Sequence, residues 1–600
     1  MSDASMPVWE RRFRAPTVTF PAWSPHAPER LAYTSTESGT YQAHVLHLAS
    51  GEERRVTDDP VGVTDAAPTA DGRAVVWFHD ETGDESGRYL VAPFDGGEAV
   101  PLLPGVPDGW GGGVALGLHT VVASISTNDG FAVYAKDGGS GPREIARSAV
   151  TLHLGGAERG GFNVAALSAD EDLLCLEHGE HGDGVRRALR VVDPRSGDVV
   201  ADLWDGAGRG LTARAWSPIP GDRRLAITHE REGEQRPAIW DLATGERRGL
   251  LVEAEGPVEA LGWWPDGSAL LLLNLYEGRD RLLRLDLTSG AIESIPHPDG
   301  SICGALVRPD GRVWYRIASG AREPRVCSQD GVEVLSARGP RAPEGTAYRS
   351  WHFSNPQGQR VHGWIVEPPG EPPHPVVMYI HGGPTWLSMD DWRPDIQALV
   401  DAGFVVALVN YRGSTGYGVE WRDALVGNIG FPESEDILAG LEELIEAGVA
   451  DPHRAVIAGW SWGGYLTLLG LGLHPDRYAA GVAGVPVGDY AACYEDLSPP
   501  LQEYDRYLLG AAPADVPDLV RERSPITYVD RVRSPVLALI AENDTRCPPR
   551  QAHAYVEALR SRGGDVEVYS YGTGHSSFVI DEEVRQTRAM LDFLARHVGG

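Results

Sequence analysis

Two patterns of apolar and polar residues divide the chain near residue 340. In the first part, short apolar stretches alternate with turns rich in Asp, Gly, Ser and Pro, which predicts many short antiparallel strands. After Pro373 the apolar stretches become continuous, and the segments between them carry leucines at helical spacing. Continuous apolar strands are typical of a parallel sheet covered on both faces. The pattern therefore predicts an all-β part followed by an open α/β sheet.

The all-β part is internally repetitive. A strand that ends in Asp-Leu-x-Ser/Thr-Gly, or in a degenerate copy of it, recurs roughly every 40–50 residues, as in propeller blades. The turn glycines of the successive copies are Gly51, Gly97, Gly139, Gly197, Gly245, Gly290 and Gly331. A four-stranded blade cannot bury both of its faces alone, so blades stack around a channel. We predict a seven-bladed β-propeller over residues 18–338, with a pair of β-sandwiches as the alternative.

The remaining boundaries follow from composition. Residues 339–349 are rich in Pro, Gly and Arg, which is typical of a linker. Residues 350–600 are predicted to form the α/β domain, which begins with an antiparallel hairpin. Residues 1–17 are an amino-terminal extension that can pack on this domain.

Charge and composition exclude several functions. The chain has 53 basic and 85 acidic residues and a net charge of −32, which disfavours nucleic acid or an anionic membrane as a partner. Lys136, the only lysine, precedes Asp137, so the chain has no Gly-Lys-Ser/Thr phosphate loop. The five cysteines form no C-x-x-C pair, and no stretch is apolar enough for a signal peptide or a membrane span. We expect a soluble cytoplasmic protein; the sequence leaves the oligomeric state open, a homo-oligomer included.

The α/β domain contains a nucleophile-elbow motif. Gly459-Trp460-Ser461-Trp462-Gly463 follows an apolar strand and precedes a helical stretch, which is the context that G-x-S-x-G requires. The two glycines remove Cβ atoms that would clash in so tight a turn. The serine hydroxyl then projects over the sheet at the amino terminus of a helix. This context predicts Ser461 as the nucleophile of an α/β-hydrolase, whereas a merely glycine-rich turn is the alternative.

A serine nucleophile needs a general base and a carboxylate that orients the base. In α/β-hydrolases the acid and then the histidine follow the serine along the chain. Asp544 and His575 come after the next two apolar strands, at the carboxyl edge where open sheets place their sites. We predict Ser461, Asp544 and His575 as the catalytic triad, and Glu542 is the nearest rival for the acid.

A glycine-rich segment follows the apolar strand 376–380. In His381-Gly382-Gly383-Pro384 the glycines let the backbone approach a substrate carbonyl. The N–H groups of Gly383 and Trp462 are therefore the predicted oxyanion hole. A tight turn without a catalytic role is the alternative.

Together these motifs resemble the prolyl oligopeptidase family of serine peptidases, and most of all its acylaminoacyl-peptidase branch and the related aminopeptidases. The resemblance spans the chain, since that family joins a seven-bladed propeller to an α/β-hydrolase domain. It implies the same triad and oxyanion hole, and a contact between Arg546 and the substrate backbone. The motifs that carry it are His381-Gly382-Gly383-Pro384, Asn410-Tyr411-Arg412-Gly413-Ser414, Gly459-Trp460-Ser461-Trp462-Gly463-Gly464-Tyr465, Asp544-Thr545-Arg546 and Gly574-His575.

Two departures from the family pattern stand out. Acylaminoacyl peptidases often begin with a helix that packs on the hydrolase domain, and here only about 17 residues precede the first blade. We therefore expect that helix to be short or absent. Trp462 stands where Tyr or Asn is usual, which leaves the backbone N–H intact and reshapes the access to the site.

The resemblance implies acyl transfer from short peptides or small aminoacyl amides, because the propeller would exclude folded proteins. It implies neither a cofactor nor a metal. An aminopeptidase and an acylaminoacyl peptidase both fit. Carboxylates of the acidic stretch 80–85, Glu85 among them, would suit a free α-ammonium group, although a solvated loop is the simpler interpretation. Val485, Val487 and Tyr490 are the predicted walls of the specificity pocket.

Three other functions remain open: hydrolysis of an aminoacyl antibiotic amide such as puromycin, an esterase, and a non-catalytic propeller scaffold. One further motif has histidines three residues apart, which can bind a metal. It is His178-Gly179-Glu180-His181, with Asp183 nearby. A solvated turn between strands is the preferred interpretation, so no metal site is predicted.

Overall fold

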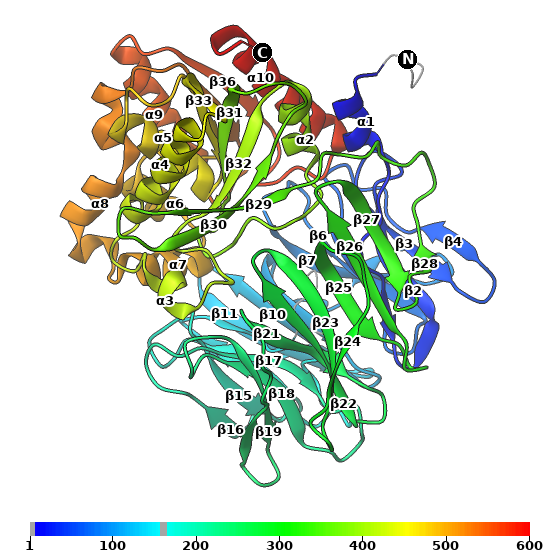
Figure 1. Cartoon of the computed structure of the whole chain (residues 1–600). Helices are drawn as coiled ribbons and strands as arrows, with labels where there is room; N and C mark the ends of the chain where they lie inside the picture. The colour runs from blue at the N-terminus through cyan, green and yellow to red at the C-terminus, as the bar shows by residue number, and fades with distance from the viewer. Residues whose placement is uncertain (1–5, 157–164, 600) are drawn as a thin grey trace.

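The computed structural model describes residues 6–156 and 165–599, in which antiparallel sheets are followed by a mixed α/β domain (Figure 1). The strands of the antiparallel part are β1 (Ala22–Ser24), β2 (Ala27–Ser35), β3 (Gln42–His47), β4 (Glu52–Arg55), β5 (Ala66–Pro68), β6 (Ala74–His79), β7 (Ser86–Pro93), β8 (Val100–Pro101), β9 (Gly109–Leu116), β10 (Thr120–Thr127), β11 (Gly130–Asp137), β12 (Arg143–Ser148), β13 (Leu152–Leu154), β14 (Leu174–His178), β15 (Ala188–Val192), β16 (Val199–Leu203), β17 (Leu211–Trp216), β18 (Arg224–His229), β19 (Arg236–Asp241), β20 (Arg247–Gly249), β21 (Val258–Trp263), β22 (Ala269–Tyr276), β23 (Arg279–Asp286), β24 (Ile292–Ile295), β25 (Ser301–Val307), β26 (Val313–Ser319), β27 (Arg322–Ser328) and β28 (Glu333–Leu335).

In the described residues these strands form five four-stranded sheets and one eight-stranded sheet. Within each four-stranded sheet, strands that follow one another in the chain are neighbours. The eight-stranded sheet joins β5–β8 to β9–β12 through a short pairing of β7 with β9. The grouping in fours has the period that the repeats predict.

The recurrent Asp-x-x-Ser/Thr-Gly segments form the tight turns between the outer strands. The turn between β23 and β24 is an example, because Asp286 accepts the N–H groups of Thr288 and Ser289 at 3.1 and 2.8 Å. Gly290 then adopts φ 74°, which glycine takes without steric cost. These local hydrogen bonds explain why the motif recurs at the same place in successive sheets.

Each sheet packs on the next along the chain through buried apolar side chains. The last sheet packs on the first, where Trp23 and Leu31 meet Trp314. Arg308 joins the same contact, with its guanidinium 4.7 and 4.6 Å from the two tryptophan rings. The sheets therefore close into a β-propeller, whereas the number of seven blades stays a prediction.

The α/β domain is built on one eight-stranded sheet of order β29-β30-β32-β31-β33-β34-β35-β36. The predicted hairpin is β29–β30, and all pairings from β32 through β36 are parallel. The strands are β29 (Arg349–Ser354), β30 (Arg360–Val366), β31 (His374–Ile380), β32 (Val405–Asn410), β33 (Ala450–Trp460), β34 (Ala480–Gly484), β35 (Val536–Ala541) and β36 (Val566–Tyr571).

Helices cover both faces of this sheet. Alternate residues of β31 explain the continuous apolar pattern, because Val376 and Met378 enter one core while Val377 and Tyr379 enter the other. Helices α4, α5 and α9 contribute to the first core, and α2 and α10 to the second. The helices are α2 (Pro394–Asp401), α3 (Val419–Asp423), α4 (Phe431–Glu446), α5 (Trp462–Leu473), α6 (Tyr490–Asp496), α7 (Pro499–Leu509), α8 (Pro517–Arg523), α9 (Pro549–Ser561) and α10 (Ile580–His597), with 3-10 turns η2 (Pro513–Asp515) and η3 (Pro525–Arg531).

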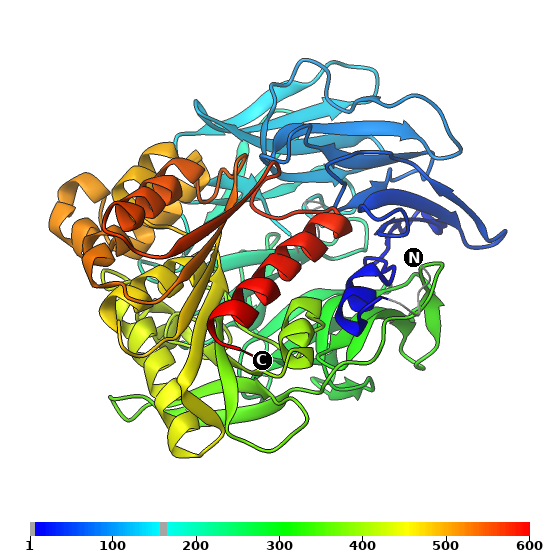
Figure 2. The ribbon, with the colours of Figure 1, turned by 90° about the horizontal axis from the view of Figure 1, so that it is seen from above.

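The amino-terminal extension contains a short helix, α1 (Val8–Arg14), which lies beside α10 (Figure 2). Phe13 packs against apolar side chains of α10. Arg12 donates to Asp401 at the end of α2 at 2.6 Å, and Arg588 of α10 donates to Glu10 at 2.6 Å. The extension is thus anchored on the α/β domain.

Charged contacts also join the propeller to the α/β domain. Arg186, after β14, donates to Asp423 of α3 at 2.6 Å, and Arg279 of β23 donates to Asp390 at 2.9 Å. None of the helices among the described residues is long and apolar enough to cross a membrane.

Candidate active site

The nucleophile elbow lies where β33 ends and α5 begins. Between them, Ser461 adopts φ 58° and ψ −119°, a backbone conformation that residues other than glycine rarely take. A Cβ atom at either Gly459 or Gly463 would collide with the carbonyl oxygen of Ile380 on β31. The two glycines therefore let β31 approach the elbow, and the strained serine is held at the carboxyl edge of the sheet.

Asp544 and His575 form the second part of the site. Asp544 follows β35, and its buried side chain accepts the N–H groups of Arg546 and Cys547, each at 2.8 Å. Its other oxygen lies 2.8 Å from Nδ1 of His575, which follows β36. With Nδ1 engaged as a donor to this carboxylate, Nε2 is the nitrogen able to accept a proton.

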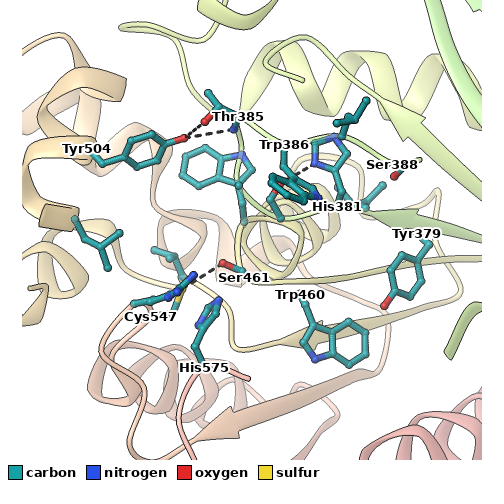
Figure 3. Close-up of a pocket in the computed structure, with 18 of the residues that line it drawn as sticks. Tyr379, His381, Thr385, Trp386, Ser388, Trp460, Ser461, Tyr504, Cys547 and His575 are labelled. Carbon is teal, nitrogen blue, oxygen red and sulfur yellow. Dashed lines mark hydrogen bonds between the residues drawn. The ribbon is translucent and has the colours of Figure 1, made fainter. Parts of the chain in front are cut away.

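Ser461 and His575 line one cavity of about 530 Å³, and Figure 3 shows them close to Cys547. The hydroxyl of Ser461 contacts Sγ of Cys547 at 3.9 Å. Between these described residues there is no hydrogen bond from Ser461 to His575. Catalytic hydrogen bonds are often long before substrate binds, so the shared cavity is the relevant observation.

The segment that follows β31 is held by His381. Its Nε2 lies 2.8 Å from the hydroxyl of Ser414, and its ring stacks on Tyr411 at a centroid distance of 4.2 Å. Burial lowers the pKa of His381 to about 4, which keeps the imidazole neutral. The anchored segment places Gly383 in the wall of the cavity, together with Trp462 and Ser461.

Trp462, which lines the cavity, contacts a buried carboxyl group. Its indole N–H donates to Glu433 of α4 at 3.3 Å. Glu433 is fully buried, and this burial raises its pKa to about 8. Nothing in the sequence distinguishes Glu433 from the other acidic residues of the same helix.

The raised pKa of Glu433 makes stability depend on pH. The folded protein retains a proton that the unfolded chain releases above about pH 4.5, so stability is lost as the pH rises toward about 8. The loss is on the order of a few kcal/mol. We expect the Tm of the wild type, measured by calorimetry, to fall more between pH 5 and pH 8 than that of Glu433→Gln. Glu435→Gln, on the same helix but half-exposed, is the control and should behave like the wild type; an equal fall in Glu433→Gln would contradict this account.

Two of the three predicted pocket walls line the cavity. Val487 and Tyr490 do so, and the Tyr490 hydroxyl donates at 2.9 Å to Asp505, a further cavity residue. Burial raises the pKa of Asp505 to about 7. Val485 is not among the residues that line the cavity. It takes φ 39° after β34 and packs in the core on the opposite face of the sheet, so the sequence-based assignment of Val485 is corrected.

A propeller loop contacts the loop that carries Asp544. Asp80 accepts the N–H of Glu85 at 2.7 Å, which shapes the loop between β6 and β7. Thr545 donates its hydroxyl to the carbonyl of Asp84 at 3.0 Å. Arg546, which lines the cavity, donates to Glu85 at 2.7 Å. The structure thus brings the two predicted substrate-contacting residues, Glu85 and Arg546, together as an ion pair beside the cavity.

Part of the chain is similar in sequence to a known protein family. Residues 391–600, which contain Ser461, Asp544 and His575, match the family model of the prolyl oligopeptidase family. These residues belong to the prolyl oligopeptidase family. This match confirms the resemblance that the motifs carry.

Individual relatives of the family are also similar. The chain is 33% identical over 201 residues to an acylamino-acid-releasing enzyme of Arabidopsis thaliana, which is 32% of this chain. The aligned part spans 26% of that relative's length. A puromycin-hydrolyzing peptidase of Mycobacterium tuberculosis superposes with a TM-score of 0.82 at 22% identity, over 99% of this chain and 96% of that one. An acylaminoacyl peptidase of Pyrococcus horikoshii gives 0.72 at 18% identity, over 98% and 97%. The two structures show that the fold is shared.

Proposed function

We propose that this protein is a serine peptidase that hydrolyses amide bonds of short peptides or small aminoacyl amides. The observation that carries the proposal is the hydrogen bond between Asp544 and His575 at the cavity that also contains Ser461. Membership of residues 391–600 in the prolyl oligopeptidase family supports the same reaction class.

The proposed reaction is acyl transfer through a covalent intermediate. His575 takes the proton of Ser461, whose oxygen attacks the substrate carbonyl, while Asp544 stabilises the imidazolium that forms. The N–H groups of Gly383 and Trp462 stabilise the negative charge on the carbonyl oxygen. His575 then gives the proton to the leaving amine, and water repeats the cycle on the acyl-enzyme.

The domain organisation proposed with this function has a seven-bladed propeller over residues 18–338, a linker over 339–349 and a catalytic domain over 350–600. The extension 1–17 packs on the catalytic domain. Support comes from the strands grouped in fours and from the closed ring of sheets. The propeller loop beside the cavity supports a barrier to folded proteins, so that short peptides are the proposed substrates. The cysteines are all free, which supports a reducing compartment such as the cytoplasm.

Which end of the peptide is recognised can be tested through Glu85. We propose that its carboxylate receives a free α-ammonium group, so Glu85→Gln should lower kcat/KM roughly 10- to 100-fold on peptides with a free amino terminus. Their N-acetylated counterparts should be unaffected. A panel of paired peptides assayed by mass spectrometry measures both, and puromycin belongs in the panel because of the structurally similar peptidase.

The matched control is Glu81→Gln, an exposed residue of the same loop that should leave both classes unchanged. An equal loss on free and N-acetylated peptides would contradict recognition of the amino terminus and assign Glu85 to holding Arg546. Including p-nitrophenyl esters in the panel distinguishes an esterase, and labelling by a fluorophosphonate probe distinguishes any serine hydrolase from a non-catalytic scaffold.

A further inference from the structure

Three polar side chains meet on one propeller sheet, far along the chain from the catalytic loops. They are His178 at the end of β14, His181 in the loop to β15, and Asp202 of β16. Strand register explains the meeting. Asp202 pairs with Arg190, which pairs with Leu176, and His178 lies two residues further along β14 on the same face.

The distances among these side chains are those of metal ligands. Nε2 of His178 lies 3.4 Å from one oxygen of Asp202, and Nε2 of His181 lies 3.3 Å from the other. Ligands about 2.0–2.2 Å from a tetrahedral zinc ion are separated by roughly 3.4 Å. The exposed ring of His181 is kept in place by stacking on Trp204 at a centroid distance of 4.7 Å.

The buried imidazole of His178 indicates that a ligand binds here. The side chain of His178 is completely buried, and within the described part of the chain its Nε2 makes no hydrogen bond, not even to the Asp202 oxygen 3.4 Å away. A buried nitrogen without a hydrogen bond is unfavourable, so a ligand that uses this atom is favoured. Nδ1 of His178 accepts the N–H of Glu180 at 3.4 Å, which is a long hydrogen bond. A His178 that binds metal through Nε2 would carry its proton on Nδ1 and would lose this contact.

The charges around the three side chains also suit a cation. Arg190 donates to Asp202 at 2.9 Å, but the same guanidinium pairs with Glu180 at 2.8 Å. Two carboxylates therefore face one arginine. A hydrogen bond from Arg190 to a ligating carboxylate is also typical of the groups that orient metal ligands.

A second trio in the same molecule provides a contrast. Glu277, His352 and His362 also lie close together, but both ring nitrogens of the buried His362 already have hydrogen-bond partners. Nε2 of His352 is 2.9 Å from Glu277, and the two ring nitrogens of His362 are 2.5 Å from the hydroxyl of Tyr417 and 3.2 Å from that of Ser350. This trio is an ordinary interdomain hydrogen-bond network and serves as a control.

We propose that His178, His181 and Asp202 form a zinc site, with water in the fourth position. Asp183, the acidic residue near the two histidines in the sequence, is not part of it, because its carboxylate accepts the N–H groups of Val185 and Arg186 within the loop. None of the three ligands lines the catalytic cavity, so the proposal does not rest on the proposed peptidase reaction.

Zinc at this site fixes the loop between β14 and β15 to β16. Arg186, at the far end of that loop, donates to Asp423 of α3 and lies over the ring of Tyr507 of α7 at 5.0 Å. Since α7 also carries Leu501 and Tyr504 of the catalytic cavity, the zinc site stiffens a segment on which one wall of that cavity rests.

The test is calorimetric titration of zinc chloride into the chelator-treated full-length protein, with Tm measured in parallel. We expect the wild type to bind zinc and to gain Tm, and His181→Ala to lose this binding component and the associated shift. His181 is partly exposed, so its substitution should leave the fold intact. Asp202→Asn should show the same loss, while His352→Ala should bind zinc as the wild type does.

Three outcomes would overturn the proposal: no zinc binding by the wild type, unchanged binding by His181→Ala, or loss of the binding in His352→Ala. Asp544, Cys547 and His575 of the catalytic cavity are a further group of ligand atoms. His575→Ala is therefore titrated as well, and loss of the zinc component in that variant with retention in His181→Ala would assign the ion to the catalytic cavity instead.

Discussion

Replacing Ser461 by alanine should abolish amide hydrolysis and leave the protein folded. The substitution removes the nucleophile, so we expect kcat/KM on aminoacyl p-nitroanilides to fall roughly 10⁴- to 10⁶-fold. Labelling by a fluorophosphonate probe should disappear with it. Stability should change little, because alanine and serine meet the same steric cost at the φ of 58° found here.

The matched control is Ser576→Ala, which changes an exposed serine next to His575. We expect this variant to retain both labelling and hydrolysis. Labelling that survives in Ser461→Ala would show that another residue is the nucleophile, and the peptidase proposal would then fail.

Asp544→Asn should lower kcat/KM by about 10⁴-fold without unfolding the protein. The asparagine oxygen can still accept the backbone N–H groups of Arg546 and Cys547, which keeps the loop in place. Its amide nitrogen, however, would face Nδ1 of His575 and favour the tautomer in which Nε2 carries the proton. Such a histidine cannot take the proton of Ser461, so the loss is catalytic and appears at unchanged Tm.

Glu542→Gln is the control for the acid, because Glu542 was its nearest rival in the sequence. In the structure it lies 3.3 Å from His553 at the surface. We expect Glu542→Gln to retain activity near that of the wild type in the same assay. A loss equal to that of Asp544→Asn would mean that the carboxylates have been assigned the wrong way round.

Most of the fold could be predicted from local patterns in the sequence. Continuous apolar strands predicted a sheet covered on both faces, and β31 shows why, since its alternate residues enter two different cores. The similar structures confirm that a propeller is joined to an α/β-hydrolase domain. The match of residues 391–600 to the family model confirms the family. Ser461, Asp544 and His575 could be chosen because each directly follows an apolar strand, and parallel strands end at one edge.

Features that depend on register and burial could not be predicted. Asp202 reaches His178 only through the pairing of three strands, which short motifs do not encode. Glu433 belongs to an acidic helix, and its burial beside Trp462 depends on how that helix packs in the fold. Val485 lies close in sequence to Val487 and is expected in the pocket, but its side chain packs in the core on the opposite face of the sheet, and its φ is 39°.

Through the loop between β6 and β7, the proposed reaction depends on how the propeller is placed against the α/β domain. Arg546, which holds Glu85, also donates its backbone N–H to the acid Asp544 two residues earlier. If a peptide reaches the cavity by parting the two domains, the pair between Glu85 and Arg546 must break first. While the domains are apart, the cavity lacks the part of its edge that the Glu85–Arg546 pair supplies. Substrate binding and bond cleavage would then be successive steps, separated by closure of the two domains.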